Sequence, residues 1–172
     1  LRNRLGIYEL PSLYNDIPAS TAISREEMAA LVAVKFRKIL DGDEATPPIF
    51  IDIATSWASR FILKATALGI MESYENHTFL PKKIINRAEL AETAVRLIGI
   101  LQARGAQFVP LVEARRVQVA DVSPDNHYYS SISRALALEI MSVTPERMFE
   151  PERVVSGAEA SRVMDIILRL AR

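Results

Sequence analysis

Apolar residues recur at helical spacing in five stretches of the chain, and polar, turn-forming residues separate these stretches. Spacings of three and four positions place side chains on one face of an α-helix, so each stretch predicts an amphipathic helix. The three longest stripes run through Met28, Leu31, Val32, Phe36 and Ile39; through Leu90, Ala94, Leu97, Ile98 and Leu101; and through Ala160, Val163, Met164, Ile167 and Leu170. The pattern therefore predicts an all-α chain of five helices with short extended connectors.

Each long stripe follows the same start signal, a Ser or Asn with a Glu three positions later. In such a capping box, the first side chain accepts a hydrogen bond from the backbone amide of the glutamate, which reaches back to the first amide. We predict that three pairs of residues cap the three long helices: Ser24 and Glu27, Asn86 and Glu89, and Ser156 and Glu159.

The shorter stripes each precede a turn-rich loop. The first of them runs from Trp57 to Leu68, with Ser56 as its expected N-cap. Gly69 is expected to end this helix with a positive φ, which glycine adopts without a Cβ clash. Pro81 lies in the loop that follows, where it prevents the helix from continuing.

These features repeat along the chain. Landmarks of the two complete copies lie 70 positions apart, as in Gly69-Ile70 and Glu139-Ile140, or Phe79-x-Pro81 and Phe149-x-Pro151. A shorter copy at the beginning contains Leu5-Gly6-Ile7 and Pro18. A fixed period predicts repeated helix-loop-helix units that stack on each other. We expect one module over residues 1–172, with repeats at approximately 1–40 (partial), 50–104 and 119–172, and a short edge strand at 117–119.

Composition narrows the function classes. The formal net charge is zero, whereas nucleic-acid binders usually carry a basic excess, so no nucleic-acid partner is expected. The chain has no cysteine and no apolar run of about 18 residues, which argues against disulfides and a membrane span. The two histidines, His77 and His127, have no ligand cluster around them, so we expect no metal and no other cofactor. Phosphate loops, nucleophile elbows and carboxylate pairs do not stand out either, and the chain is not expected to be an enzyme.

The order and spacing of the landmarks resemble the S-layer homology (SLH) domain family. The family's repeat has an aromatic-x-Asp-Val entry, a Trp-led first helix, a Gly-Ile step, Phe-x-Pro and a Thr-Arg-Ala-Glu helix start. The residues that match are Phe50, Asp52, Trp57, Ile62, Gly69-Ile70, Phe79, Pro81 and Arg87-Ala88-Glu89. The resemblance implies a pseudo-threefold bundle in which the three second helices meet at the centre, and a non-catalytic module that anchors exported proteins.

The same resemblance implies where the module acts and what it binds. Its expected location is the cell wall, the cell surface or the periplasm. The expected ligand is a cell-wall polysaccharide, such as a pyruvylated one, or a peptidoglycan-linked glycan, bound in grooves between repeats. Because the chain begins in what resembles the end of a helix, we expect it to be a fragment of a longer polypeptide, which would carry the targeting information.

Two arginines are the leading candidates for ligand contact. The family's ligand arginine corresponds to Arg25 and Arg87, each in the first turn of a long helix. There an arginine adds a two-pronged donor for a carboxylate beside free helix amides and a positive helix end. A pyruvyl ketal presents such a carboxylate. The other ligand candidates are Trp57 and Tyr74, which could stack on sugar rings, and the loop residues Ser73 and Asn76.

The copies are not equivalent. The third has Gly157 in place of the arginine and His127 in the Trp position, and Ser73 replaces a family glycine in the second copy. The second copy is the most complete, so the sequence ranks Arg87 above Arg25. Simpler interpretations are a salt-bridged Arg87 and a Trp57 that anchors the core. The alternative function is a degenerate module that docks other envelope proteins or the rest of its own chain.

Overall fold

The computed structural model describes residues 10–42, 46–110 and 119–171, which form seven α-helices and one 3₁₀ helix. They are α1 (Ser12–Asp16), the 3₁₀ helix η1 (Ile17–Ala19), α2 (Arg25–Lys35), α3 (Arg37–Leu40), α4 (Ser59–Ala67), α5 (Arg87–Ala103), α6 (Tyr129–Ala137) and α7 (Gly157–Leu170). The predicted all-α class is confirmed. The two helices beyond the predicted five are short: α1 lies in the first loop, and α3 continues α2 after a break at Phe36.

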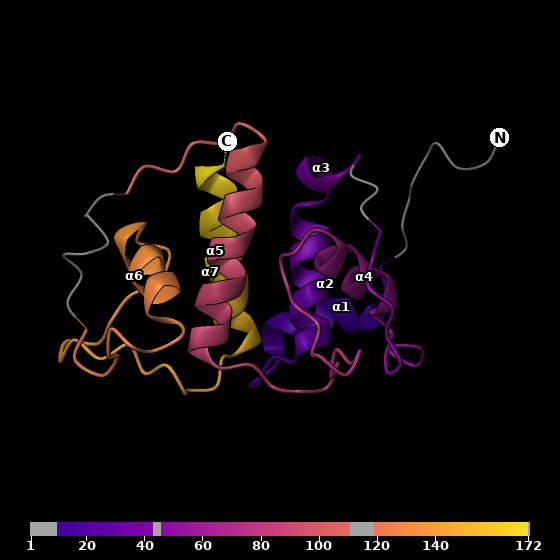
Figure 1. The fold of residues 1–172 in the computed structure, drawn as a ribbon, viewed down its shortest axis with the longest axis horizontal. Helices are drawn as coiled ribbons and strands as arrows, with labels where there is room; N and C mark the ends of the chain where they lie inside the picture. The colour runs from indigo at the N-terminus through magenta and orange to yellow at the C-terminus, as the bar shows by residue number, and fades with distance from the viewer. Residues whose placement is uncertain (1–9, 43–45, 111–118, 172) are drawn as a thin grey trace.

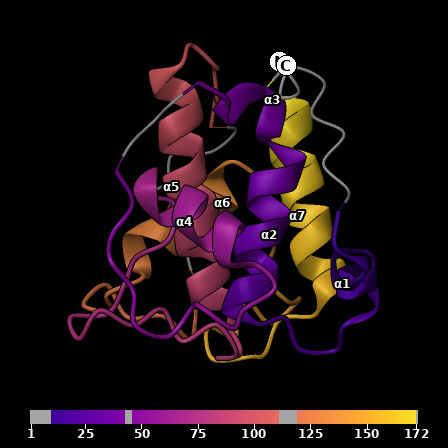
Figure 2. The same ribbon diagram turned by 90° about the vertical axis from the view of Figure 1, so that its right-hand side faces the viewer.

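The three long helices form the centre of the molecule, as expected. Helix α7 packs against both α2 and α5. It lies behind α5 in the view of Figure 1 and beside α2 in that of Figure 2. Helix α4 packs on α2, and α6 packs on α5. The short helices α4 and α6 therefore each cover the long helix that precedes them in the chain.

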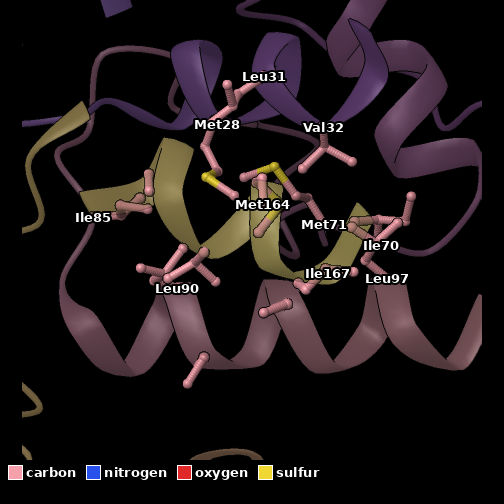
Figure 3. Close-up of a cluster of buried hydrophobic side chains, with 14 of the residues drawn as sticks. Met28, Leu31, Val32, Ile70, Met71, Ile85, Leu90, Leu97, Met164 and Ile167 are labelled. Carbon is pink, nitrogen blue, oxygen red and sulfur yellow. The ribbon is translucent and has the colours of Figure 1, made fainter. Parts of the chain in front are cut away.

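The core lies where the long helices meet. Figure 3 shows Met28 of α2, Met164 of α7 and Leu90 of α5 in one apolar cluster, and all three side chains are fully buried. Ile70 and Ile85 reach the same cluster from the loop that joins α4 to α5. Burying side chains of this size stabilises the fold by about 1.5–3 kcal/mol each.

The capping prediction is confirmed in full at two helices. Ser24 accepts from the Glu27 amide, Asn86 accepts from the Glu89 amide, and both glutamates bond back to the first residue. The third box is wrong in one half: Ser156 accepts from the Glu159 amide at 3.1 Å, but the Glu159 carboxylate pairs with arginines instead. Arginine side chains from the neighbouring loop and helix have replaced the backbone amide as its partner.

The short helix α4 begins later than predicted. It starts at Ser59, and the hydroxyl of Ser56 accepts from the amide of Ala58 at 3.2 Å in a turn before the helix. Gly69 ends α4 with a φ of +71°, as the sequence predicts. The expected strand at 117–119 and the Leu5-Gly6-Ile7 landmark lie wholly or largely outside the described residues.

Three backbone hydrogen bonds form a closed ring just before the long helices. The amide of Ile85 donates to the carbonyl of Ile23 at 3.0 Å, Val155 donates to Ile85 at 3.2 Å, and Ile23 donates to Val155 at 2.8 Å. These residues stand before α2, α5 and α7, so the ring gives this end of the bundle a pseudo-threefold arrangement. The symmetry stops there, because the outer face of α7 exposes Arg162, Asp165 and Arg169, whereas α4 and α6 cover α2 and α5.

Candidate functional site

Each long helix begins against the loop of another repeat. The amides of Arg25 and Glu26 donate to the carbonyls of Lys83 and Pro81, both at 2.9 Å. The amides of Arg87 and Ala88 donate to Arg153 and Pro151 in the same way, both at 3.0 Å. These helix-start amides are therefore occupied, and the expectation of free amides beside the two arginines is wrong. Any anion that binds here relies on side chains.

The first interface leaves a groove of about 170 Å³, which we call the Arg25 groove. Its walls come from three repeats: the start of α2, the loop after α4, one face of α5, and the residues just before α6. The lining residues used below are Arg25, Glu72, Ser73, Tyr74, Glu89, Glu92, Arg96, His127 and Tyr128. Two of the predicted ligand residues, Ser73 and Tyr74, therefore lie in the same groove as Arg25.

Arg25 forms the base of this groove and is 8% exposed. Its Nε donates to the carbonyl of Phe79 at 2.7 Å, and one terminal nitrogen donates to the carbonyl of Glu72 at 2.6 Å. The guanidinium also lies over the rings of Tyr74 and Phe79, at 5.0 and 4.3 Å from their centroids. Within the described residues it makes no ion pair, and burial lowers its pKa. A buried cation held only by carbonyls and aromatic faces retains the capacity to bind an anion.

The second interface forms the Arg87 groove, which measures about 430 Å³ and lies between the second and third repeats. Arg87 occupies the position of Arg25 and bonds the equivalent carbonyls, those of Phe149 and Ser142, both at 2.7 Å. It differs because its guanidinium also pairs with the Glu159 carboxylate. Both side chains of this pair are 9% exposed. Arg87 is therefore neutralised from within the fold.

The third interface is closed by backbone rather than by an arginine. The amide of Gly157 donates to the carbonyl of Ser20 at 2.8 Å, and η1 lies directly on the start of α7. A Cβ on residue 157 would lie 1.6 Å from the carbonyl oxygen of Ile17. Gly157 thus permits a close approach of two backbones. The missing arginine reflects tight packing at this interface.

The remaining predicted ligand residues lie outside the Arg25 groove. The indole nitrogen of Trp57 donates to the carboxylate of Glu26 at 3.1 Å, and its ring meets Phe61 edge-on. Trp57 is therefore an anchor between α2 and α4, in agreement with the simpler interpretation. Asn76 is exposed in the loop and accepts from the hydroxyl of Thr78 at 2.6 Å.

Sequence reasoning missed several residues that shape this region. Glu26 is 2% exposed and holds the Ser56 hydroxyl at 2.6 Å, the Trp57 indole and Lys82. Its only sequence signal is a charge at a position where the other two repeats have alanine. Arg96 and Glu72 form an ion pair in the Arg25 groove. Their separation in sequence gives no sign of that contact.

The described part of the chain holds no group of three or more metal-type ligands, and none of its helices is long and apolar enough to cross a membrane. The guanidinium of Arg25, together with the rings of Tyr74 and Tyr128, suits a polar ligand that has both an anionic group and a flat apolar face.

Comparison with known proteins gives two findings. Residues 50–91 and 121–161 match the model of the S-layer homology domain. Over 100 residues, which make up 58% of this chain, the sequence is 32% identical to a surface layer protein of Brevibacillus choshinensis. The chain spans only 8% of the length of that relative. The matched segments begin at residue 50, and the partial repeat over 1–40 stays a prediction.

Proposed function

Since the chain belongs, through residues 50–91 and 121–161, to the S-layer homology family of non-catalytic cell-wall-binding domains, we propose that it anchors its protein by binding an anionic cell-wall glycan in the Arg25 groove. The family and the similarity to a surface layer protein point to the cell surface or cell wall. The class of glycan, the groove that binds it and the residues that contact it are what we propose.

The observation that carries the proposal is the state of Arg25. Its guanidinium is buried in the lining of an open groove, and within the described residues no carboxylate forms an ion pair with it, while Glu89 and Asp52 favour its charged form from a distance. A ligand carboxylate, such as that of a pyruvyl ketal, would supply the missing ion-pair partner and a two-pronged hydrogen bond. Tyr74 lies beside Arg25, so a sugar ring attached to that carboxylate could rest on an aromatic face.

This geometry ranks the two arginines in the opposite order to the sequence. Arg87 occurs in the more complete repeat, but Glu159 already fulfils the role that a ligand carboxylate would have. We assign glycan binding to Arg25 and a structural role to Arg87. The alternative, a docking module without glycan binding, draws its support from the neutralised Arg87 and the closed interface at Gly157.

A sedimentation assay with purified cell-wall sacculi tests the proposal. Arg25→Lys retains the charge but removes the fork, and we expect at least about a 20-fold loss of affinity, because truncating a buried charged contact costs about 2–5 kcal/mol. Arg169→Gln, a change at an exposed arginine of α7, is the matched control and should bind normally. Far-ultraviolet circular dichroism confirms that the variants are folded. Undiminished binding of Arg25→Lys would contradict the assignment of Arg25, whereas a wild-type chain that does not sediment with the sacculi would favour the docking alternative.

A further inference from the structure

The Arg25 groove contains a second arginine that the repeat pattern does not supply. Arg96 lies on the face of α5 that lines the groove, and the equivalent positions of the other long helices are Val34 and Ile166. One terminal nitrogen of Arg96 is 2.6 Å from the carboxylate of Glu72, and the other is 3.0 Å from that of Glu92. Burial alone would lower the pKa of Arg96, but these two hydrogen bonds outweigh it and raise the pKa.

Glu72 contacts both arginines of the groove. Its backbone carbonyl accepts from Arg25 at 2.6 Å, and its carboxylate pairs with Arg96. The carboxylate of Glu72 therefore already occupies a position beside Arg96 that an anionic group of a ligand could take. The equivalent residue of the third repeat is Ser142, so in the Arg87 groove the carboxylate that pairs with an arginine comes from Glu159 of α7 and not from this loop position.

The charges of the other lining residues show why the Glu72 carboxylate affects the binding of an anion. Arg25 and Arg96 are opposed by Glu72, Glu89 and Glu92, so the groove has no positive excess to attract an anion. Glu89 is committed to Lys83 and to the cap of α5. Glu92 lies four residues before Arg96 on the same helix and holds its guanidinium in position. Glu72 alone belongs to the loop, and its side chain is 67% exposed.

We propose that Arg96 is a second, specificity-determining cation for an acidic sugar, and that the carboxylate of Glu72 is an internal competitor that the ligand must displace. This inference rests on the proposed function and adds a selection step to it. Acidic sugars that offer a carboxylate to Arg96 displace Glu72, whereas neutral sugars do not.

The competition is weak enough to be reversible. Partly exposed ion pairs contribute little to stability, because water screens them and ordering two long side chains is unfavourable. The Glu72–Arg96 pair is of this kind, with side chains 67% and 30% exposed. Glu72→Gln should therefore tighten binding of an acidic sugar by about two- to fivefold. Glu92 would still hold Arg96, so the freed nitrogen would remain aimed at the groove.

Isothermal titration calorimetry with a synthetic methyl hexoside, with and without a pyruvate ketal, tests the proposal on the full chain. We compare Glu72→Gln, Arg96→Gln and the double variant. The control is Glu75→Gln, an exposed residue of the same loop outside the groove lining. The expected results are tighter binding by Glu72→Gln, weaker binding by Arg96→Gln, no gain from Glu72→Gln when Arg96 is absent, and no change in the control.

Two results overturn the inference: unchanged or weaker binding by Glu72→Gln, or a gain that persists without Arg96, which would indicate a general charge effect. The proposed function fails separately. If the wild-type chain binds the ketal sugar and Arg25→Lys does not, while Glu72→Gln changes nothing, only the competitor is wrong. If the wild-type chain and Glu72→Gln each bind the two hexosides with equal affinity, both the proposed function and the competitor role of Glu72 are contradicted. Binding that appears only in Glu72→Gln supports strong competition.

Discussion

Arg25 and Arg87 occupy equivalent positions at two helix starts, yet their surroundings give them different roles. Both donate to two carbonyls of the neighbouring loop, and both lie against a phenylalanine ring. The difference lies in the glutamate at the start of the following long helix. In the Arg87 groove, Glu159 of α7 pairs with the arginine. In the Arg25 groove, the equivalent Glu89 of α5 bonds to Lys83 instead. The Glu159 carboxylate thus gives Arg87 a structural role, whereas Arg25 remains able to pair with a ligand.

This difference predicts unequal effects on stability. Arg87→Met removes a buried ion-pair partner and should lower the free energy of unfolding by about 3 kcal/mol, since Arg153 compensates Glu159 only in part. Arg25→Met removes two charge-assisted hydrogen bonds but also a buried unpaired cation, so the loss should be smaller, about 1–2 kcal/mol. Urea unfolding followed by circular dichroism measures both. Equal losses, or a greater loss at Arg25, would contradict the distinction.

Asp52 stabilises the loop from which Arg25 receives its acceptors. Its two oxygens accept from the amides of Phe79 at 2.9 Å and Leu80 at 2.8 Å, and Leu80 has a φ of +55°. A left-handed conformation of this kind costs about 1–2 kcal/mol for a residue with a Cβ. Asp121 makes the same two bonds in the third repeat.

Asp52→Ala should therefore destabilise the chain by about 2–3 kcal/mol, because hydrogen bonds to a charged group are the stronger kind. Asp52→Asn retains one acceptor oxygen and should cost about half as much. Asp125→Ala, a change at an exposed aspartate, is the control and should stay within about 0.5 kcal/mol of wild type. Thermal unfolding by calorimetry gives these differences. A neutral Asp52→Ala would mean that the loop does not depend on this carboxylate.

At the scale of elements, the start of α7 packs against a loop from elsewhere in the chain, as the starts of α2 and α5 do, but without an arginine. In the other two interfaces an arginine side chain fills the space between helix start and loop, whereas here η1 lies directly on the backbone. The loop of the first repeat has one residue more than the others between the proline and the cap, as in Pro18 to Ser24 against Pro81 to Asn86.

Two alanine substitutions of glycine should consequently have opposite effects. Gly157→Ala places a Cβ on the carbonyl of Ile17 and should destabilise by about 1–3 kcal/mol, because backbone has to move. Gly99→Ala lies in α5 with no heavy atom within 4 Å of the new Cβ, and should stabilise by about 0.5–1 kcal/mol. Urea unfolding of the two variants measures the difference. Stabilisation by Gly157→Ala would show that η1 does not press on α7.

The sequence predicts those elements whose causes are local. Capping boxes depend on residues three positions apart, and the positive φ of Gly69 depends on one residue, so both are correct. The third box is wrong only in its second half, because the Glu159 carboxylate pairs with Arg87 and Arg153. The burial of Glu26 beside Trp57 and the Glu72–Arg96 pair are not predicted for the same reason, since both join residues far apart in the sequence. Contacts between repeats depend on how loops approach helices, which periodicity does not encode.

At the scale of the whole molecule, the interfaces are linked in a circle. The start of α2 rests on the loop of the second repeat, that of α5 on the third, and that of α7 on the first. The ring of Ile23, Ile85 and Val155 closes the same circle through backbone hydrogen bonds. Loosening one interface removes hydrogen-bond partners from an element that also belongs to another. The repeats are therefore expected to unfold together.

The single tryptophan makes this testable. Trp57 reports on the contact between α2 and α4, because its indole bonds to Glu26, while far-ultraviolet circular dichroism reports on all helices. In urea the two signals should give coincident transitions, as expected for one cooperative unit. Gly157→Ala acts at a different interface, where α7 meets η1, yet it should shift both transitions to the same lower midpoint. A Trp57 transition that stays at the wild-type midpoint while the helical signal shifts would show that the repeats unfold independently. In that case the closed ring would not couple the Arg25 groove to the rest of the bundle.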